Sequence, residues 1–256
     1  MFGPHGHTSE DLKDANEREI TYLATECPLV TKVKNEVAVN TAEGRVTIYY
    51  GQRNKEGLLH PETRAAMSSG DAILVTSLEE ALSEEILEII LDKNMVAFAS
   101  QTTHNADEVE AMGNKLKEKY PNIKLPKKKD ICYATRDRQQ AAKAVIESGV
   151  KLVVVVGDKK TSSNTRSLAA VAVEKGARVF IVNNRKEINP ADFYGADSVG
   201  VVASASAPET QIRRVIGFFT GRGSEERMIA VADESKIWFK RPESVKPFVP
   251  EIIWQD

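Results

Sequence analysis

Six short runs rich in valine, isoleucine and other apolar residues recur along the chain and constrain its fold more than any other feature. Continuous apolar runs are typical of strands that are covered on both faces, as in parallel sheets. Between the runs, the periodicity changes to that of amphipathic helices. This alternation of strand and helix predicts an α/β fold with mostly parallel sheets. The expected strands cover residues 45–50, 71–77, 94–100, 150–157, 177–183 and 197–203.

Three of the intervening stretches have clear helical patterns. Residues 77–93 place their leucine and isoleucine side chains on one stripe with glutamates opposite, which predicts one helix. Residues 105–120 start with an acidic turn and end with lysines, an order that complements the helix dipole. Residues 165–177 have a similar apolar pattern and contain Gly176 near their end, and a further helix is expected after Pro208.

The strands and helices fall into two similar halves. A basic segment with two prolines, residues 121–130, is typical of a linker between them. We therefore expect quasi-repeated, three-layer α/β units at residues 28–128 and 129–220 rather than one continuous winding. A C-terminal tail, residues 221–256, has short extended pieces and is expected to pack across the units.

The overall composition narrows the classes of partner. The net charge of −2 gives no general electrostatic reason to expect nucleic acid as a partner. No apolar run reaches the roughly 18 residues that a membrane-spanning helix requires, so we expect no membrane partner. The N-terminus lacks the basic and apolar regions of a secretory signal, and two cysteines are too few for a disulfide framework. A cytoplasmic protein is the resulting expectation.

The two cysteines occupy matching positions. Cys27 and Cys132 each follow a short extended run and precede an amphipathic stretch, which predicts that both lie at strand-to-helix junctions. In a reducing compartment, a cysteine more often serves metal binding or chemistry than a disulfide. The alternative for each is a small, buried apolar side chain, and the pattern alone leaves both interpretations open.

Polar clusters follow several of the predicted strands, where ligands bind in open α/β folds. Side-chain hydroxyls and free N–H groups at a helix N-terminus could bind an anion such as a diphosphate. The alternative is that Ser162 and its neighbours only cap a helix. His60 and Glu62 flank a proline, so they either line one rim, with Glu62 able to deliver a proton, or form a surface turn. The candidate residues are His5, His60, Glu62, Thr102, Ser162, Ser163, Asn164 and Ser206.

Taken together, the motifs are more specific than any one of them. The segments ECPLVTKV, HPE, QTT, DICYATRDRQ, SSN and SASAPE occur in this order. The chain resembles, from about His5 to its end, the 4-hydroxy-3-methylbut-2-enyl diphosphate reductase family of iron–sulfur enzymes. The resemblance implies three similar α/β units around a central site that holds a 4Fe-4S cluster, with one cysteine thiolate from each unit.

The resemblance also implies roles for individual residues. Cys27 and Cys132 match two of the three cluster ligands, and thiolates are the normal ligands of such clusters. Glu62 matches the residue that relays protons. The implied reaction is a two-electron reductive dehydroxylation of an allylic diphosphate in the methylerythritol phosphate pathway, which gives isopentenyl and dimethylallyl diphosphate. The implied electron donor is a protein such as ferredoxin or flavodoxin. The implied substrate-binding residues are His5, His60, Thr102, Ser162, Ser163, Asn164 and Ser206.

The sequence departs from the family pattern at its N-terminus, where the first cysteine, in a Gly-Phe-Cys context, has no counterpart. Residues 1–27 therefore match only a remnant of the first unit, which we expect to be largely missing. Met1 is then either an internal methionine of a longer chain or the start of a shortened paralog that binds a diphosphate without redox activity. A third possibility is a subunit that receives the missing cysteine from another chain. Two thiolates are expected to hold a cluster weakly.

Overall fold

The structure, a computed structural model, describes residues 3–53, 56–93, 95–126 and 130–229. The described chain divides into two compact units. Unit 1 contains the described residues up to Thr102 together with those from 109 to 130, and unit 2 contains residues 103–108 and those from Ile131 onward. Most of the predicted C-terminal tail, residues 230–256, lies outside the described residues.

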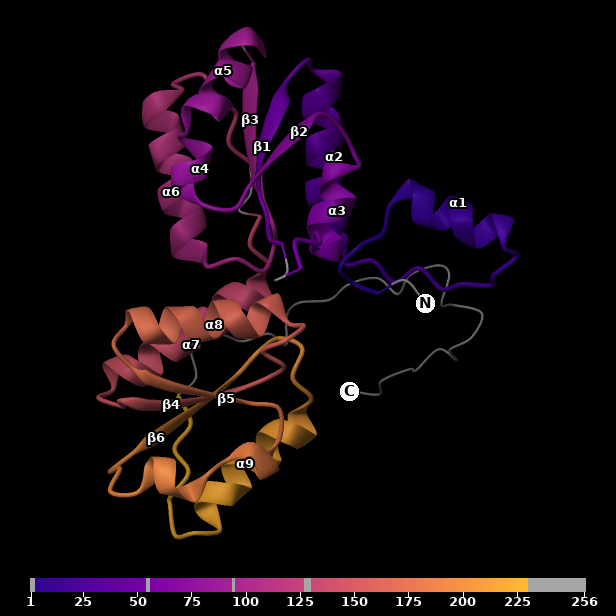
Figure 1. Cartoon of the computed structure of the whole chain (residues 1–256). Helices are drawn as coiled ribbons and strands as arrows, with labels where there is room; N and C mark the ends of the chain where they lie inside the picture. The colour runs from indigo at the N-terminus through magenta and orange to yellow at the C-terminus, as the bar shows by residue number, and fades with distance from the viewer. Residues whose placement is uncertain (1–2, 54–55, 94, 127–129, 230–256) are drawn as a thin grey trace, which may run out of the picture. The chain divides into compact units, whose positions relative to one another are not determined.

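Unit 1 is built on a three-stranded parallel sheet in the order β2-β1-β3 (Figure 1). β1 (Val46–Tyr50) lies in the middle and pairs with β2 (Ala72–Val75) and β3 (Val96–Ser100). Every residue of β1 and β3 is buried, as expected for strands covered on both faces. The helices of the same half are α1 (Ser9–Glu17), α2 (Pro28–Ala42), α3 (Pro61–Met67), α4 (Leu78–Ala81), α5 (Glu84–Lys93) and α6 (Ala106–Lys119).

Helices cover both faces of this sheet. On one face, Val33 and Val37 of α2 pack with Tyr49 and Ala99 of the strands. On the other face lies α6, whose Gly113 approaches the ring of Phe98 closely enough that an added Cβ would lie 3.7 Å from it. Figure 1 shows the same arrangement, with α2 and α3 on one side of the sheet and α6 on the other. Unit 1 is therefore a three-layer α/β unit.

Unit 2 repeats this topology with a parallel sheet in the order β5-β4-β6, again with its first strand in the middle. β4 (Leu152–Val156) pairs with β5 (Arg178–Val182) and β6 (Val199–Ala203). Alternate valines of β4 point to opposite faces, so the strand contributes to two separate apolar cores. The helices of this unit are α7 (Tyr133–Glu147), α8 (Ser163–Glu174), η1 (Arg185–Glu187), η2 (Pro190–Phe193) and α9 (Glu209–Thr220).

All six predicted strands are present, and the predicted α/β class with parallel sheets is confirmed. The single helix predicted over residues 77–93 is wrong, because α4 and α5 are separate. Ser77 caps α4 by accepting a hydrogen bond from the Glu80 N–H, and Ser83 accepts from the Ile86 N–H at the start of α5. Two serine caps within one apolar pattern thus divide it.

The predicted strand-to-helix junctions are correct only in their helical part. Cys27 is the N-cap residue of α2 and Cys132 that of α7, but irregular chain rather than a strand directly precedes each of them. The alternative interpretation of His60-Pro61-Glu62 as a surface turn is wrong, because these residues start helix α3 and Glu62 is buried. Within the described part of the chain, no helix is both long enough and apolar enough to span a lipid bilayer.

Candidate functional site

Glu62 and Thr102 form a buried pair in unit 1. Glu62, in the first turn of α3, is fully buried, and Thr102 follows the end of β3. The Thr102 N–H donates to Glu62 Oε1 at 2.6 Å, and the Thr102 hydroxyl lies 3.1 Å from Glu62 Oε2. Two residues that are 40 positions apart are thus brought together because the start of α3 lies beside the carboxyl end of the sheet.

Burial raises the pKa of Glu62 to about 8, since the ionised carboxylate has lost its water. The two hydrogen bonds from Thr102 oppose this effect, whereas the negative charges of Asp130 and Glu26 add to it. At neutral pH the carboxyl group therefore holds its proton most of the time. A protonated carboxyl beside a threonine hydroxyl can act as a general acid, which is the chemistry predicted for Glu62.

His5 and His60 are neighbours in the same unit. Their rings meet edge to face, with centroids 5.2 Å apart and an interplanar angle of 68°. His60 is the N-cap residue of α3, and its Nδ1 accepts a hydrogen bond from the Glu62 N–H at 3.3 Å. Two predicted substrate-binding histidines thus lie together, and one of them directly contacts the backbone of the predicted acid.

Cys27 is a free, half-buried cysteine at the N-terminus of α2, and Pro28 is the first residue of that helix. Its side chain makes no capping hydrogen bond, while its N–H donates to the Pro4 carbonyl at 3.0 Å. The N-terminus of a helix stabilises negative charge. This position therefore suits a thiolate, and the backbone bond ties the cysteine to the segment that carries His5.

Cys132 occupies the corresponding position of α7 in unit 2, and there a threonine completes a chain of contacts. The Thr135 N–H donates to Cys132 Sγ at 3.3 Å, and the Thr135 hydroxyl lies 2.9 Å from the same sulfur. This hydroxyl also donates to Asn164 Oδ1 at 2.5 Å. Thr135 thus links a predicted metal ligand to a predicted substrate-binding residue. Sequence reasoning missed it, although a threonine three residues after an N-cap was a usable signal.

The serines of unit 2 gather at the N-terminus of α8. Ser162 caps this helix by accepting from the Thr165 N–H at 3.2 Å, and whether it also binds an anion stays a prediction. Its hydroxyl also lies 3.3 Å from that of Ser206, which lies 3.2 Å from that of Ser204. Gly157 allows this close approach, because a Cβ there would lie 2.6 Å from the Ser204 hydroxyl oxygen.

Ser163, another predicted substrate-binding residue, contacts a threonine rather than the other serines. Its hydroxyl forms a short hydrogen bond with that of Thr103, and Ser163 is almost fully buried. The structure thus brings the predicted site residues together in two groups, one in each unit. Whether the sulfurs of Cys27 and Cys132 converge stays a prediction.

Asp130 is a buried acidic residue that the sequence did not single out. Its carboxylate accepts from the Ser100 N–H at 2.9 Å and from Lys32 Nζ at 2.8 Å. Glu36 shares the same lysine, and burial together with the Asp130 charge raises the pKa of Glu36 to about 7.

A cavity of about 760 Å³ lies beside α2. Its lining includes Lys32, Glu36 and Lys124.

The donor atoms fit an iron–sulfur cluster only in part. Both cysteines are free thiols at helix N-termini, which suits thiolate ligation. Among the described residues, however, no group of three or more His, Cys, Asp and Glu side chains is placed to hold a metal ion. Cys27 and Cys132 stay predicted ligands, two of the three cysteines that the family resemblance implies.

Comparison with known proteins decides the family. The sequence model of the LytB protein matches residues 1–220. The chain belongs to the LytB family. A LytB relative from Shewanella pealeana, named 4-hydroxy-3-methylbut-2-enyl diphosphate reductase, is 35% identical over 221 residues, which cover 84% of this chain and 68% of the relative. A relative of the same name from Alcanivorax borkumensis is 33% identical, over 96% of this chain and 78% of its own length.

Solved structures of LytB enzymes have the same fold. The E-1-hydroxy-2-methyl-but-2-enyl-4-diphosphate reductase of Plasmodium falciparum superposes with a TM-score of 0.76 at 24% identity, covering 85% of this chain and 66% of that one. A second structure, described as (E)-4-hydroxy-3-methyl-but-2-enyl diphosphate reductase, the terminal enzyme of the non-mevalonate pathway, gives a TM-score of 0.54 at 25% identity. The family resemblance and the enzyme class that it implied are thus confirmed, and the relatives do not favour the non-redox alternative.

Proposed function

We propose that this chain takes part in the reductive dehydroxylation of 4-hydroxy-3-methylbut-2-enyl diphosphate to isopentenyl and dimethylallyl diphosphate. The reaction consumes two electrons and two protons, breaks the allylic C–O bond, forms a C–H bond and releases the oxygen as water. The observation that carries the proposal within the structure is the buried Glu62 carboxyl, which keeps its proton near neutral pH and lies against Thr102.

Glu62 and Thr102 form a path for one of these protons. When Glu62 is protonated on Oε2, that O–H donates to the Thr102 hydroxyl oxygen 3.1 Å away. The Thr102 proton is then free to point to a ligand oxygen. A proton that reaches the departing hydroxyl group turns it into water, which leaves far more readily than hydroxide.

The serine group of unit 2 suits the diphosphate end of such a substrate. Hydroxyl donors at the N-terminus of α8, namely Ser162 and Ser206, with Asn164 close by, match a diphosphate, since helix N-termini and O–H groups bind anions without a lysine-rich loop. His5 and His60 would add further donors. Ser163 and Thr103 hold each other, so we assign Ser163 to the rim of this group.

Cys27 and Cys132 are the residues that would hold the 4Fe-4S cluster. When bound, such a cluster would pass electrons from the donor to the substrate. The electron donor, which we propose to be a ferredoxin or a flavodoxin, follows from the family resemblance alone. The cytoplasmic location that we propose is supported by the low cysteine count.

The test uses this chain after anaerobic reconstitution with iron and sulfide, with dithionite as the reductant. We expect calorimetric binding of 4-hydroxy-3-methylbut-2-enyl diphosphate and a slow turnover that Glu62→Gln lowers by about a hundredfold or more, to background, while affinity changes little. Absence of substrate binding, or a turnover that does not depend on Glu62, would contradict the proposal. Substrate binding with no turnover at any iron content would support the non-redox diphosphate-binding alternative instead.

A further inference from the structure

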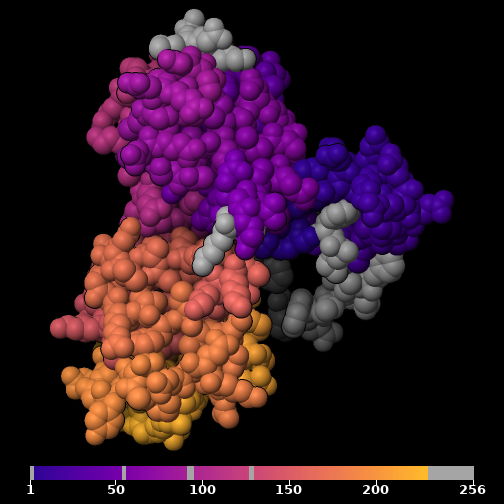
Figure 2. Space-filling model, viewed as in Figure 1, coloured from indigo at the N-terminus to yellow at the C-terminus, as the bar shows by residue number. Residues whose placement is uncertain are grey.

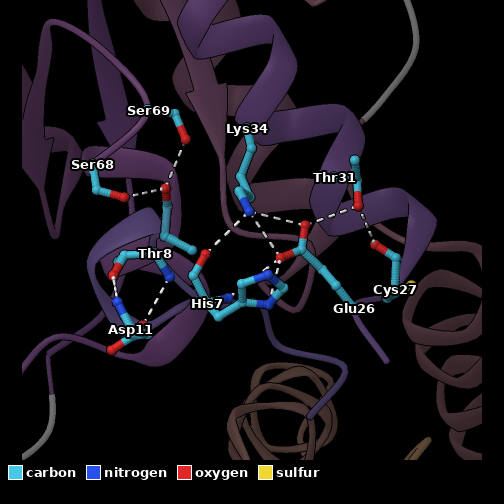
Figure 3. A network of polar contacts seen from close by, with 10 residues as sticks. His7, Thr8, Asp11, Glu26, Cys27, Thr31, Lys34, Ser68 and Ser69 are labelled. Atoms are coloured by element: carbon cyan, nitrogen blue, oxygen red, sulfur yellow. Dashed lines mark hydrogen bonds and ion pairs between the residues drawn. The ribbon is translucent and has the colours of Figure 1, made fainter. Parts of the chain in front are cut away.

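A network of charged side chains joins two short segments of unit 1 (Figure 3). One segment, residues 3–8, carries His5, and the other is the N-terminus of α2 with Cys27 as its cap. Glu26, which directly precedes Cys27, lies at the centre of the network, and its side chain is only 9% exposed. Its Oε2 accepts from the His7 N–H and lies 3.3 Å from His7 Nδ1.

Lys34 and Thr31 complete the network from α2. Lys34 Nζ donates to both carboxylate oxygens of Glu26, at 2.8 and 3.1 Å, and to the His7 carbonyl at 3.1 Å. The Thr31 hydroxyl donates to Glu26 Oε1 at 2.8 Å. Both carboxylate oxygens of Glu26 are thus held by donors from α2, and one of them also accepts from the His7 N–H.

The backbone between His5 and His7 leaves little freedom. Gly6 has φ +92°, a region that residues with a Cβ rarely adopt. A Cβ at Gly6 would also lie 3.0 Å from Val30 Cγ1 and 3.1 Å from Ala65 Cβ. The segment is therefore packed tightly against α2 and α3, and the Cys27 N–H bond to the Pro4 carbonyl closes it from the other end.

This tightly packed segment carries His5, and the His5 ring meets the His60 ring edge to face. Beyond the segment, α1 adds little support: Ala15 is its one buried residue, and Figure 2 shows much of its indigo surface exposed. Arg64 of α3 pairs with Asp11 at 2.7 Å, but that contact is on the surface. Glu26, Lys34 and Gly6 thus provide side-chain and packing contacts that hold the His5 segment against α2.

We propose that Glu26 is a positioning residue: its carboxylate, fixed by Lys34, holds the His5 segment against the cap of α2, so that one network sets both the His5–His60 pair and Cys27. The inference rests on the proposed function for the roles of His5 and Cys27, but the positioning itself is a property of the chain without any ligand. Glu26 would act through these residues, since the network as described directs its carboxylate to His7, Thr31 and Lys34.

The test exploits the fact that the chain has only four histidines. With carbon-13 at Cε1, their ring signals can be assigned by single His→Gln substitutions, and a cross-peak between His5 and His60 reports their contact. We expect Glu26→Gln and Lys34→Met each to shift the His5 and His7 signals and to remove the cross-peak. Lys34→Met serves as the second variant if Glu26→Gln fails to fold, as judged by circular dichroism.

Glu43→Gln is the matched control, because Glu43 also pairs with two cations, Lys124 and Arg45, but on the exposed surface. It should leave all four histidine signals unchanged. Unshifted His5 and His7 signals with an intact cross-peak in both network variants would overturn the proposal. Titration with inorganic diphosphate separates it from the proposed function: we expect about tenfold weaker binding in Glu26→Gln. A parent chain that does not bind diphosphate would count against the proposed function, while the cross-peak would still decide the positioning role.

Discussion

Glu62 carries a consequence for stability that can be measured without substrate or cluster. Its carboxyl is fully buried, and its pKa is raised from 4.5 to about 8 in the folded chain. Below pH 4.5 the group is protonated in both the folded and the unfolded state. As the pH rises towards 8, the unfolded state releases this proton while the folded state retains it, so the free energy of unfolding falls. Above pH 8 the loss is complete.

The size of this loss follows from the two pKa values. They differ by about 3.5 pH units, and each pH unit corresponds to about 1.36 kcal/mol, so ionisation of Glu62 costs about 5 kcal/mol of folding free energy at most. Glu62→Gln removes the titration but keeps the shape. Its amide oxygen can accept from the Thr102 N–H and its NH₂ can donate to the Thr102 hydroxyl, so we expect a fold as stable as the protonated parent.

The assay is urea unfolding followed by circular dichroism at about pH 5, 7 and 9 for the parent, Glu62→Gln and Glu43→Gln. The difference in unfolding free energy between the Glu62→Gln variant and the parent cancels the other titrating groups, such as Glu36. Between about pH 5 and 9, we expect this difference to grow by about 3–5 kcal/mol, with the variant the more stable protein. The change should appear in the unfolding transition of unit 1, which contains Glu62. Parallel pH profiles, within about 1 kcal/mol, would refute the reasoning, and the exposed Glu43 should give such a parallel profile.

Three further predictions concern unit 2 and the cysteines. Ser162→Ala and Asn164→Ala should each weaken the binding of inorganic diphosphate in calorimetry, and Ser162→Ala should also cost about 1 kcal/mol in urea unfolding through the lost cap of α8; unchanged binding would count against the anion site. Thr135→Val should destabilise unit 2 by about 1–3 kcal/mol and weaken diphosphate binding, because it leaves Asn164 Oδ1 without its buried donor, while Thr135→Ser should restore both; a Val variant as stable as the parent would contradict this. Reconstitution of the chain should give well under about four irons per chain, and both Cys27→Ser and Cys132→Ser should lower this further; near four irons with substantial turnover would show that two thiolates suffice.

The strands could be predicted because their signal is local. The valine run of β4 is buried on both faces in the structure, as its composition required, and the other five runs also form strands of the two sheets. The break between α4 and α5 was missed because the apolar stripe continues across it. There the two serine caps, not the stripe, decide where each helix begins.

The sequence pattern could predict which residues belong to the site, but not which of them contact one another. His60 and Glu62 stood out by type, whereas the burial of Glu62 and its bond to Thr102 depend on a packing of segments 40 positions apart. Asp130 followed a basic run and looked like part of a solvated linker. In the folded chain its carboxylate accepts from the Ser100 N–H, a contact across 30 residues that no local pattern encodes.

Three buried carboxyl groups of unit 1, those of Glu26, Glu62 and Asp130, have different hydrogen-bond partners. Glu26 contacts Lys34, and Asp130 contacts Lys32. For Glu62, the described hydrogen bonds come from Thr102, a neutral residue. A nearby cation would favour the ionised form and make a poor acid at neutral pH. Among the described hydrogen bonds of Glu62 none comes from a lysine or arginine, and burial there gives an acid that holds its proton near neutral pH. A lysine alone does not decide the outcome, because Glu36 contacts Lys32 and burial together with the Asp130 charge still raises its pKa. Burial and the number of donors to each carboxyl group therefore separate Glu26, which holds two segments together, from Glu62, which can donate a proton.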